Sequence, residues 1–364
     1  MIDPGIRLPV RLENVTAGWL TEALAANHPG VEVLSARADD VLWGTGTKLR
    51  VQVEYNEAGR AAGLPRALFV KGGFADHREL MEQCYVLEVR FYRDLLPQLA
   101  LNVPRAYFAG DDVANKQHIV IMEDLSLRGV NFCRVQNPLS YAQAAAHLDV
   151  IARYQAKWWD SPEFKPGGAL DDLAIWEALP DGEAGAYHWG QLRPEVWEKF
   201  TRLPRGLAIP KYMHDRDRMQ AALIRLTEFG RREPHCFLHG DYHLGNLYFD
   251  ADGTPGTLDW QALRKGHWSH DVTYFMVSAL DIADRKRWDM ALLSHYLERL
   301  ALHGVKAVPD FDTAYDAFRR QILDGLYFWL VNPVEFQSEE NNCAVVPRFA
   351  MAALDHGTFE TLLR

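Results

Sequence analysis

A short β-rich segment interrupts the second half of the chain, in which the apolar residues otherwise recur with helical spacing. Three runs typical of strands, Cys236–Leu238, Leu247–Phe249 and Thr257–Asp259, lie within this segment. Asp252–Gly253, between the second and third runs, is a turn signal that predicts a hairpin. Because a hairpin returns the chain to its starting end, the residues that enter it and those that leave it are expected to lie together.

Polar residues enter and leave this hairpin at positions where packing does not require them. The run His239–Asn246 precedes the second strand, and Asp259 ends the third. Phosphoryl transfer needs such a set: a carboxylate that orients and deprotonates the attacking hydroxyl, and hard oxygen ligands that hold Mg²⁺ against the phosphates. Asp241 suits the role of catalytic base. Asn246 and Asp259 suit the role of Mg²⁺ ligands.

Strand-like and helix-like segments are divided between the two halves of the chain. Residues 41–122 have the apolar alternation of strands, with one helix predicted over residues 78–96. Ser140 is a candidate helix N-cap. Helical spacing then predicts further helices over residues 140–159, 216–230, 285–303, 312–330 and 348–363. The pattern predicts an α+β fold in which a β-rich part precedes a mainly helical one.

The length of 364 residues exceeds the usual size of one hydrophobic core, so two lobes are expected. We predict a β-rich N-terminal lobe over residues 1–124 and a mainly helical C-terminal lobe over residues 125–364. The change in pattern places the connector between the lobes near residues 122–126.

Composition and charge narrow the class of protein. The chain is 48% hydrophobic and 24% charged, as ordinary folded proteins are. Its net charge of -10 argues against binding to nucleic acid or to an anionic membrane. The four cysteines form no close pair, which favours a reducing cytoplasm. The N-terminus has no export pattern, and no apolar run reaches the roughly 18 residues of a membrane helix. No pattern predicts an oligomeric state.

The residues that enter the hairpin resemble the catalytic loop of the aminoglycoside phosphotransferase and choline kinase superfamily, which has a protein-kinase-like two-lobed fold. His239–Gly240–Asp241 is followed by Asn246, five residues after the aspartate, and by Asp259 on the next strand. The ecdysteroid-kinase-like branch is the most similar. The resemblance implies an ATP- and Mg²⁺-dependent small-molecule kinase that phosphorylates an alcohol. It also implies that the N-terminal lobe binds the nucleotide and that the C-terminal lobe carries catalysis and substrate binding. Asp-Trp-Gln at Asp259, in place of the Asp-Phe-Gly of protein kinases, favours metabolite over protein acceptors.

The resemblance also implies supporting roles for two further residues. His239 is similar to a histidine that stabilises the catalytic loop, so we assign it no proton transfer. Asp271 is similar to an aspartate that holds the backbone of that loop. An N-cap for the apolar stretch after Asp271 is compatible with this role.

Upstream residues extend the resemblance to nucleotide binding. Lys71, at the end of an apolar strand, matches the lysine that holds the α- and β-phosphates. Glu88, seventeen residues later, is the first choice for its carboxylate partner, with Glu82 as a competitor. Taken alone, an isolated lysine or glutamate of this kind is more often a solvent-exposed residue.

Two backbone segments are further candidates for ATP binding. A loop that would cover the phosphates is formed by Gly44, Thr45, Gly46 and Thr47, although an ordinary β-turn explains this pattern equally well. Thr45 and Thr47 are candidate donors to phosphate oxygens. In the connector, the backbone groups of Glu123 and Leu125 would bind the adenine edge.

The acceptor pocket is expected among the helices after Asp271. The candidate lining residues are Trp268, Tyr274, Asp324 and Tyr327. Aromatic and acidic side chains suit a quaternary ammonium such as choline or the amine of an aminoglycoside, while the ecdysteroid-kinase-like branch suits a bulky apolar alcohol. All three acceptor classes stay open, because aromatic residues at helical spacing are more often part of a core.

Three other interpretations compete with a kinase. A metal-dependent hydrolase would use ligands drawn from His239, Asp241, His243, Asp259, His267, His270 and Asp271. Such a site would not explain Asn246 or the Lys71 and Glu88 pair. A nucleotide-binding, pseudokinase-like protein would be expected to lack a catalytic carboxylate. An ordinary surface hairpin would make the spacing of Asp241, Asn246 and Asp259 a coincidence.

Overall fold

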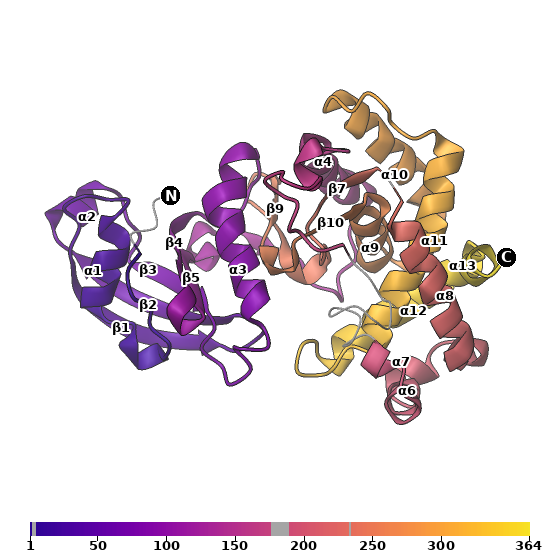
Figure 1. The fold of residues 1–364 in the computed structure, drawn as a ribbon, viewed down its shortest axis with the longest axis horizontal. Coiled ribbons are helices and arrows are strands. Elements are labelled where there is room, and N and C mark those ends of the chain that lie inside the picture. The colour runs from indigo at the N-terminus through magenta and orange to yellow at the C-terminus, as the bar shows by residue number, and fades with distance from the viewer. Residues whose placement is uncertain (2–4, 176–188, 233) are drawn as a thin grey trace. The chain divides into compact units, whose positions relative to one another are not determined.

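The computed structural model describes residue 1 and residues 5–175, 189–232 and 234–364 (Figure 1). The chain divides into two compact units. The first comprises Met1–Asn131 and Phe249–Ala262, and the second comprises Phe132–Tyr248 and Leu263–Arg364. Residues 249–262 thus group with the first unit, although they lie within the predicted second lobe.

A five-stranded antiparallel sheet forms the centre of the first unit. Its strands, in the spatial order β1-β2-β3-β5-β4, are β1 (Val33–Leu42), β2 (Thr47–Tyr55), β3 (Ala67–Gly72), β5 (Gln117–Glu123) and β4 (Ala106–Asp112). Side chains alternate along β2: Leu49, Val51 and Val53 are buried, while the alternate residues Lys48 and Arg50 are partly exposed. One face of the sheet is therefore apolar, as a half-buried strand requires.

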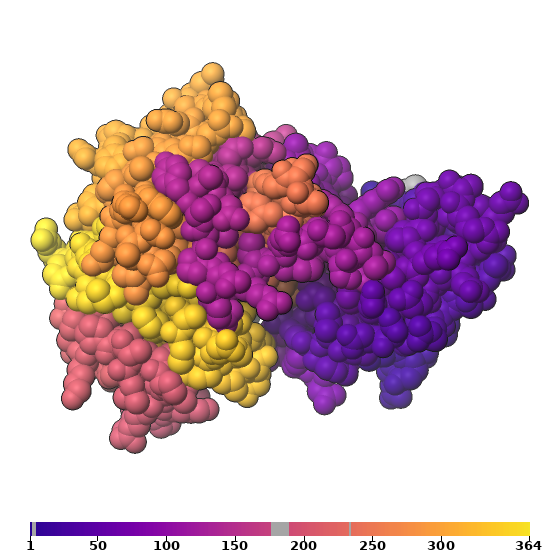
Figure 2. Space-filling view, turned by 180° about the vertical axis from the view of Figure 1, so that it is seen from behind, coloured from indigo at the N-terminus to yellow at the C-terminus, as the bar shows by residue number. Residues whose placement is uncertain are grey.

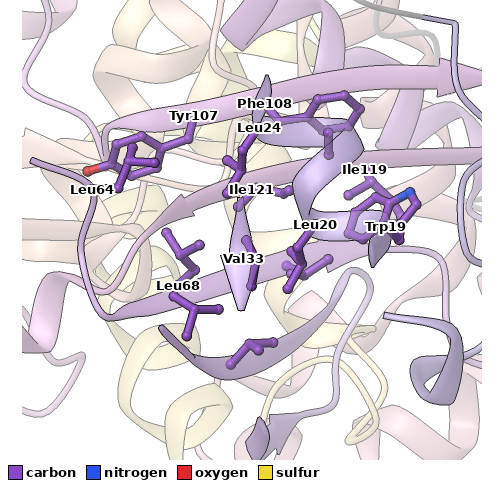
Figure 3. Close-up of a cluster of buried hydrophobic side chains, with 14 of the residues drawn as sticks. Trp19, Leu20, Leu24, Val33, Leu64, Leu68, Tyr107, Phe108, Ile119 and Ile121 are labelled. Atoms are coloured by element: carbon purple, nitrogen blue, oxygen red, sulfur yellow. The ribbon is translucent and has the colours of Figure 1, made fainter. Parts of the chain in front are cut away.

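Helix α1 (Ala17–Ala25) contributes to the hydrophobic core of this unit (Figure 3). Its Trp19, Leu20 and Leu24 belong to the same cluster as residues from the apolar face of the sheet, such as Phe108 and Ile121. The ring of Trp19 meets that of Phe108 edge-on, with centroids 6.2 Å apart. Burial of these side chains leaves the other face of the sheet for polar residues. A short helix, α2 (Glu57–Ala61), follows β2.

Helix α3 (Glu82–Arg90) contacts β4 and β5 and continues as a π-helical turn at Phe91–Leu95. The helix predicted over residues 78–96 therefore begins four residues later than expected. Phe91 stacks on Trp260, with ring centroids 4.2 Å apart. This contact helps to explain why residues 249–262 group with the first unit.

The described part of the second unit is mainly helical and contains the antiparallel strand pair of β7 (His235–Leu238) and β10 (Arg264–His267). Its helices are α4 (Tyr141–Lys157), α6 (Pro194–Thr201), α7 (Pro204–Leu207), α8 (Arg216–Gly230), α9 (Ser269–Ala279), α10 (Ile282–Leu302), α11 (Phe311–Leu330), α12 (Glu339–Asp355) and α13 (Thr358–Leu362). Every residue of α9 is buried, and this helix contacts α4, α10, α11 and α12. Figure 2 shows α12 and α13 (yellow) beside the rose-coloured helices, among which α7 contacts α12 and α8 contacts α13.

Two short strands, β8 (Leu247–Phe249) and β9 (Pro255–Thr257), flank the predicted turn. Gly253 has a φ of 86°, a conformation that favours glycine, and Asp250 closes the turn through hydrogen bonds with Gly253 and Thr254. A two-residue strand, β6, covers Asn131–Phe132.

The predicted α+β class, with a β-rich part before a mainly helical one, is confirmed. Ser140 caps α4 in a reciprocal capping box with Gln143, as its position suggested. The single helix predicted over residues 348–363 is wrong, because Gly357 adopts a left-handed conformation, with φ at 60°, and separates α12 from α13. Among the described residues, no helix is both long enough and apolar enough to cross a membrane.

Candidate active site

Lys71 is the centre of a buried ion network in the first unit. Its Nζ lies 2.7 Å from Oε1 of Glu88 and 2.8 Å from Oδ1 of Asp259. Lys71 comes from β3, Glu88 from α3 and Asp259 from the segment after β9. Lys71 and Glu88 are each 3% exposed, whereas the Asp259 side chain is 18% exposed. The network thus presents one partly accessible carboxylate beside a buried cation.

The charges in this network stabilise one another. Burial opposes the charged form of Lys71, but Asp259 and Glu88 more than offset it and raise the pKa of Lys71 above its usual value. Lys71 therefore stays a cation at neutral pH. Burial raises the pKa of Glu88, and Lys71 counteracts that effect. Asp259 has a φ of 67°, which is unusual outside glycine, and strained residues of this kind cluster at functional sites.

The predicted phosphate loop, residues 44–47, is held by side chains from outside it. The Tyr85 hydroxyl donates to the Thr45 carbonyl oxygen at 2.6 Å. Nε2 of His77 lies 3.2 Å from the Gly44 carbonyl oxygen and 3.3 Å from that of Thr45. These bonds fix the loop carbonyls, so the loop has a defined conformation without a ligand.

The Thr47 side chain does not have the orientation that a phosphate donor would need. It is fully buried on the same side of β2 as the core residue Leu49, while Lys48 between them lies on the opposite side. Its Oγ1 has no hydrogen-bond partner in the described part of the chain. Phosphate binding by Thr47 therefore stays a prediction for its backbone rather than its hydroxyl.

Gly46 lies directly against the Lys71 side chain, which predicts a strong effect of an added methyl group. A Cβ at Gly46 would stand 2.7 Å from Cε of Lys71, whose ammonium is held by two carboxylates. Gly46→Ala is therefore expected to displace Lys71 and to weaken ATP binding by about tenfold, the equivalent of one lost charged contact. Isothermal titration with Mg²⁺-ATP measures this change.

Gly18→Ala is the matched control for that substitution. Gly18 lies in α1, outside the predicted phosphate loop, and a Cβ there would stand at an ordinary 3.9 Å from Oγ1 of Thr16, so ATP affinity is expected to stay unchanged. Equal affinities of the two variants would contradict a role for the contact between Gly46 and Lys71.

The predicted connector is ordered by polar contacts within the first unit. The Glu123 N–H donates to the Arg105 carbonyl oxygen at 2.9 Å, and its Oε1 accepts from Arg105 N–H at 2.8 Å. Leu125 is buried and begins a short 3₁₀ helix that is capped by Asp124. Because the Glu123 N–H is already bonded, only its carbonyl oxygen and the Leu125 backbone stay as predicted contacts for adenine.

Asp241, the predicted base, lies in the second unit with its side chain 34% exposed. The Asn246 amide donates to the Asp241 carbonyl oxygen at 2.9 Å and to its Oδ2 at 3.1 Å. The Tyr274 hydroxyl donates to Oδ1 at 3.4 Å, and Nε2 of His243 lies 3.4 Å from Oδ2. The carboxylate is thus oriented by its neighbours and still accessible to a substrate.

The two predicted metal ligands have the donor chemistry that Mg²⁺ requires. The amide nitrogen of Asn246 is used in its bonds to Asp241, which leaves its side-chain oxygen as the ligand atom. Asp259 supplies a carboxylate, one oxygen of which is bonded to Lys71. Amide and carboxylate oxygens are hard donors of the kind that Mg²⁺ takes in proteins.

Asp271 accepts hydrogen bonds from the backbone that precedes Asp241. Its carboxylate, which is fully buried, accepts from the N–H groups of His239 at 2.8 Å and Gly240 at 3.0 Å, and from the Tyr154 hydroxyl at 2.6 Å. The N-cap role, which was expected to be compatible with this one, is wrong, because α9 begins at Ser269 and Asp271 lies inside its first turn. His239 contributes by accepting the Asp241 N–H at its Nδ1, at 3.2 Å.

A buried histidine continues this network. His270 lies 3.2 Å from Asp271 through Nδ1 and 3.1 Å from Asp324 through Nε2. Burial opposes its charged form, but Asp324 and Asp271 outweigh burial and raise the pKa of His270 to about 9. Its ring also stacks on that of Tyr274, at 5.9 Å between centroids. His270 is therefore an imidazolium at neutral pH.

The sequence profile described as the phosphotransferase enzyme family matches residues 74–308. The chain belongs to this family. The match spans Glu88, Asp241, Asn246 and Asp259 and confirms the expected family and the phosphotransferase class. It does not single out the ecdysteroid-kinase-like branch.

Several solved phosphotransferase structures are similar to this chain at low sequence identity. A macrolide 2'-phosphotransferase from Brachybacterium faecium is 16% identical, with a TM-score of 0.48 over 90% of this chain and 98% of that one. The Plasmodium vivax ethanolamine kinase is 9% identical, with a TM-score of 0.49 over 93% of this chain and 84% of that one. A choline kinase from Streptococcus pneumoniae is 14% identical, with a TM-score of 0.47 over 92% of this chain and 98% of that one. No curated protein sequence matches the chain.

The four predicted acceptor-pocket residues of this phosphotransferase are all buried. Trp268 stacks on Tyr296 at 5.3 Å, and Tyr327 stacks on Trp197 at 6.4 Å. Asp324 pairs with His270, and Tyr274 contacts Asp241. Packing accounts for the two residues with stacking contacts, and contact with an acceptor stays a prediction for all four.

The histidines of this phosphotransferase are engaged in ways that do not favour a hydrolytic metal site. Nδ1 of His243 accepts the Gly245 N–H at 3.1 Å, and Nδ1 of His267 lies 2.8 Å from the Ser269 hydroxyl. His270 is held between two aspartates. In the described ranges, no three His, Cys, Asp or Glu side chains are arranged to hold a metal ion.

Sequence reasoning missed the residues that support the predicted site. Tyr85 and His77 hold the predicted phosphate loop, and Tyr154 donates to Asp271. Tyr154 is 117 positions from Asp271, and no local pattern connects them. For Tyr85 the signal was available, because it lies one helical turn before Glu88 and so on the same side of α3.

Proposed function

We propose that this phosphotransferase moves the γ-phosphoryl group of ATP to a hydroxyl of a small molecule. The observation that carries the proposal is the ion network of Lys71, Glu88 and Asp259. Glu88 is 17 positions from Lys71 and Asp259 is 188 positions from it, yet both carboxylates bind the same buried ammonium. Phosphoryl transfer uses a fixed cation to bind the phosphate oxygens and an adjacent carboxylate to bind the metal ion.

Nucleotide binding is assigned to the first unit. Lys71 binds phosphate oxygens, and Glu88 holds its ammonium in place. The loop at residues 44–47 covers the phosphates through backbone N–H groups, while the Glu123 carbonyl and the Leu125 backbone bind adenine. Fixing the phosphates in one position aligns the γ-phosphorus for in-line attack.

Asp241 is assigned the role of base. It accepts the proton of the acceptor hydroxyl while that oxygen forms a bond to the γ-phosphorus. The bond from phosphorus to the bridging oxygen breaks, and ADP leaves with the electron pair. Asn246 and Tyr274 hold the carboxylate in one orientation during this step.

Asn246 and Asp259 are assigned as Mg²⁺ ligands, through an amide and a carboxylate oxygen. When bound, Mg²⁺ supplies charge neutralisation at the phosphate oxygens and helps to orient them. Phosphate binding and proton acceptance are assigned to Lys71 and Asp241.

ADP release in the presence of Mg²⁺-ATP and a panel of alcohols tests the proposal. The panel contains amino sugars, quaternary ammonium alcohols and sterol-like alcohols, because the sequence leaves these classes open. At least one alcohol is expected to stimulate ADP release and to gain one phosphoryl group by mass spectrometry, and EDTA is expected to stop the reaction. ATP binding without transfer to any alcohol would favour the pseudokinase-like alternative. Tightly bound zinc with ATP-independent hydrolysis would favour the hydrolase.

A further inference from the structure

Lys48 places a second ammonium group beside the Lys71 network. It lies on β2 directly opposite Lys71 on β3, in an antiparallel ladder. Residues that face each other in this way project from the same side of a sheet. Lys48 also follows the loop at residues 44–47 directly. Two lysine side chains therefore share the polar face of the sheet next to the predicted phosphate loop.

Lys48 forms no ion pair with any carboxylate that the structure describes. Lys71 takes both nearby carboxylates, at 2.7 and 2.8 Å. Within the described residues, the Lys48 side chain forms neither a hydrogen bond nor an ion pair, although it is partly buried. Burial first and the Lys71 charge second lower the pKa of Lys48, and Asp259 and Glu88 offset this only in part. The charged form of Lys48 is thus less well stabilised than that of Lys71.

The next cation along the same face of β2 shows the contrast. Arg50, two residues after Lys48, donates to Asp124 at 2.7 Å and to Asp39 at 3.2 Å. A partly buried ammonium without such partners, beside another ammonium, is unfavourable in the free protein. An arriving anion would remove that cost, so the position is suited to a negatively charged ligand.

We infer that Lys48 is a second phosphate-binding residue, which contacts the polyphosphate chain of a nucleotide together with Lys71. The inference deepens the proposed function and depends on it for the identity of the ligand as a nucleotide. The part of the inference that Lys48 binds an oxyanion depends only on its unpaired ammonium and on the Lys71 ammonium beside it. Binding and turnover can therefore be tested separately.

Titration of four ligands into four proteins tests the inference. The ligands are Mg²⁺-ATP, Mg²⁺-ADP, inorganic tripolyphosphate and adenosine, and the proteins are wild type, Lys48→Gln, Lys48→Arg and Lys116→Gln. Lys116 is the matched control, since it is an exposed lysine of the same unit at the turn between β4 and β5. Loss of one charged contact is expected to weaken ATP, ADP and tripolyphosphate binding by about tenfold or more in Lys48→Gln. Adenosine affinity should not change, Lys48→Arg should recover most of the binding, and Lys116→Gln should behave as wild type.

Unliganded stability separates a binding role from a structural one. Lys48→Gln removes an unpaired charge beside Lys71, so its thermal midpoint is expected to equal or exceed that of wild type. A lower midpoint together with unchanged ATP affinity would mark Lys48 as structural and overturn the inference. If wild type binds neither ATP nor tripolyphosphate, both the inference and the proposed function fall. If tripolyphosphate binding depends on Lys48 but no alcohol is phosphorylated, only the proposed function falls.

Discussion

Asp241→Asn is expected to slow phosphoryl transfer by about 10²- to 10⁴-fold, the usual contribution of a general base. The amide has the shape of the carboxylate but cannot accept the hydroxyl proton. Asn246 donates to Oδ2 and Tyr274 to Oδ1 in the wild type, so one of the two can still donate to the oxygen that the amide keeps. Nucleotide affinity is expected to stay within about threefold of wild type, because Asp241 is assigned to the acceptor rather than to ATP. Single-turnover rates and ATP titrations measure the two quantities separately.

Asp252→Asn is the control for this experiment. Asp252 lies in the exposed hairpin turn, where Asp-Gly and Asn-Gly are both favoured, so its substitution should change neither rate nor affinity. Full activity of Asp241→Asn would refute the assignment of the base. A parallel loss of ATP affinity would move Asp241 from the chemical step to nucleotide binding.

Short-range patterns were sufficient where a feature depends on neighbouring residues. Asp241 and Asn246 are five positions apart, and the structure joins them by two hydrogen bonds. Ser140 was recognisable as a helix cap because its partner Gln143 is three residues away. The Lys71 and Glu88 pair needed more, namely the resemblance to a family, because the two residues lie on a strand and on a helix that a loop connects.

Contacts between distant segments could not be predicted in the same way. Nothing in the sequence indicates that Tyr154 donates to Asp271, or that Phe91 stacks on Trp260. The pairing of Lys71 with Asp259 joins residues 188 positions apart. Tertiary packing decides such contacts, and a single sequence carries no local trace of them.

Two further features depend on signals that were present in the sequence. Strand alternation places Thr47 with Leu49 on the apolar face of β2 and Lys48 on the opposite face, and the Thr47 side chain is buried accordingly. Gly357 inside the predicted last helix is a typical C-terminal signal, and the helix does end there. In both places local backbone geometry decided the outcome: the alternation of a strand at Thr47 and the left-handed conformation at Gly357.

Asp271→Asn is expected to lower the free energy of unfolding of the protein by about 3 to 5 kcal/mol, as for a buried ion pair that loses one partner. The carboxylate is fully buried and accepts from two backbone N–H groups and from Tyr154. An amide in its place would turn its NH₂ group toward one of these donors and leave it without an acceptor. His270 would also keep only Asp324 as an ion partner. Urea denaturation measures the loss.

The pH dependence of this difference identifies the carboxylate charge as its source. Burial alone would raise the pKa of Asp271, but hydrogen bonding and charge interaction with His270 more than offset it and lower the pKa below 3.8. A depressed folded-state pKa contributes stability above the unfolded-state value and loses it as the pH falls. The gap between wild type and Asp271→Asn should therefore be constant from about pH 7 to about pH 5 and narrow only below about pH 4.

Asp312→Asn, an exposed substitution in the first turn of α11, should cost less than about 1 kcal/mol. It controls for the general effect of exchanging aspartate for asparagine in this unit. A loss at Asp271 no larger than that at Asp312 would mean that the backbone before Asp241 keeps its conformation without the carboxylate. Asp271 would then have no part in positioning the proposed base.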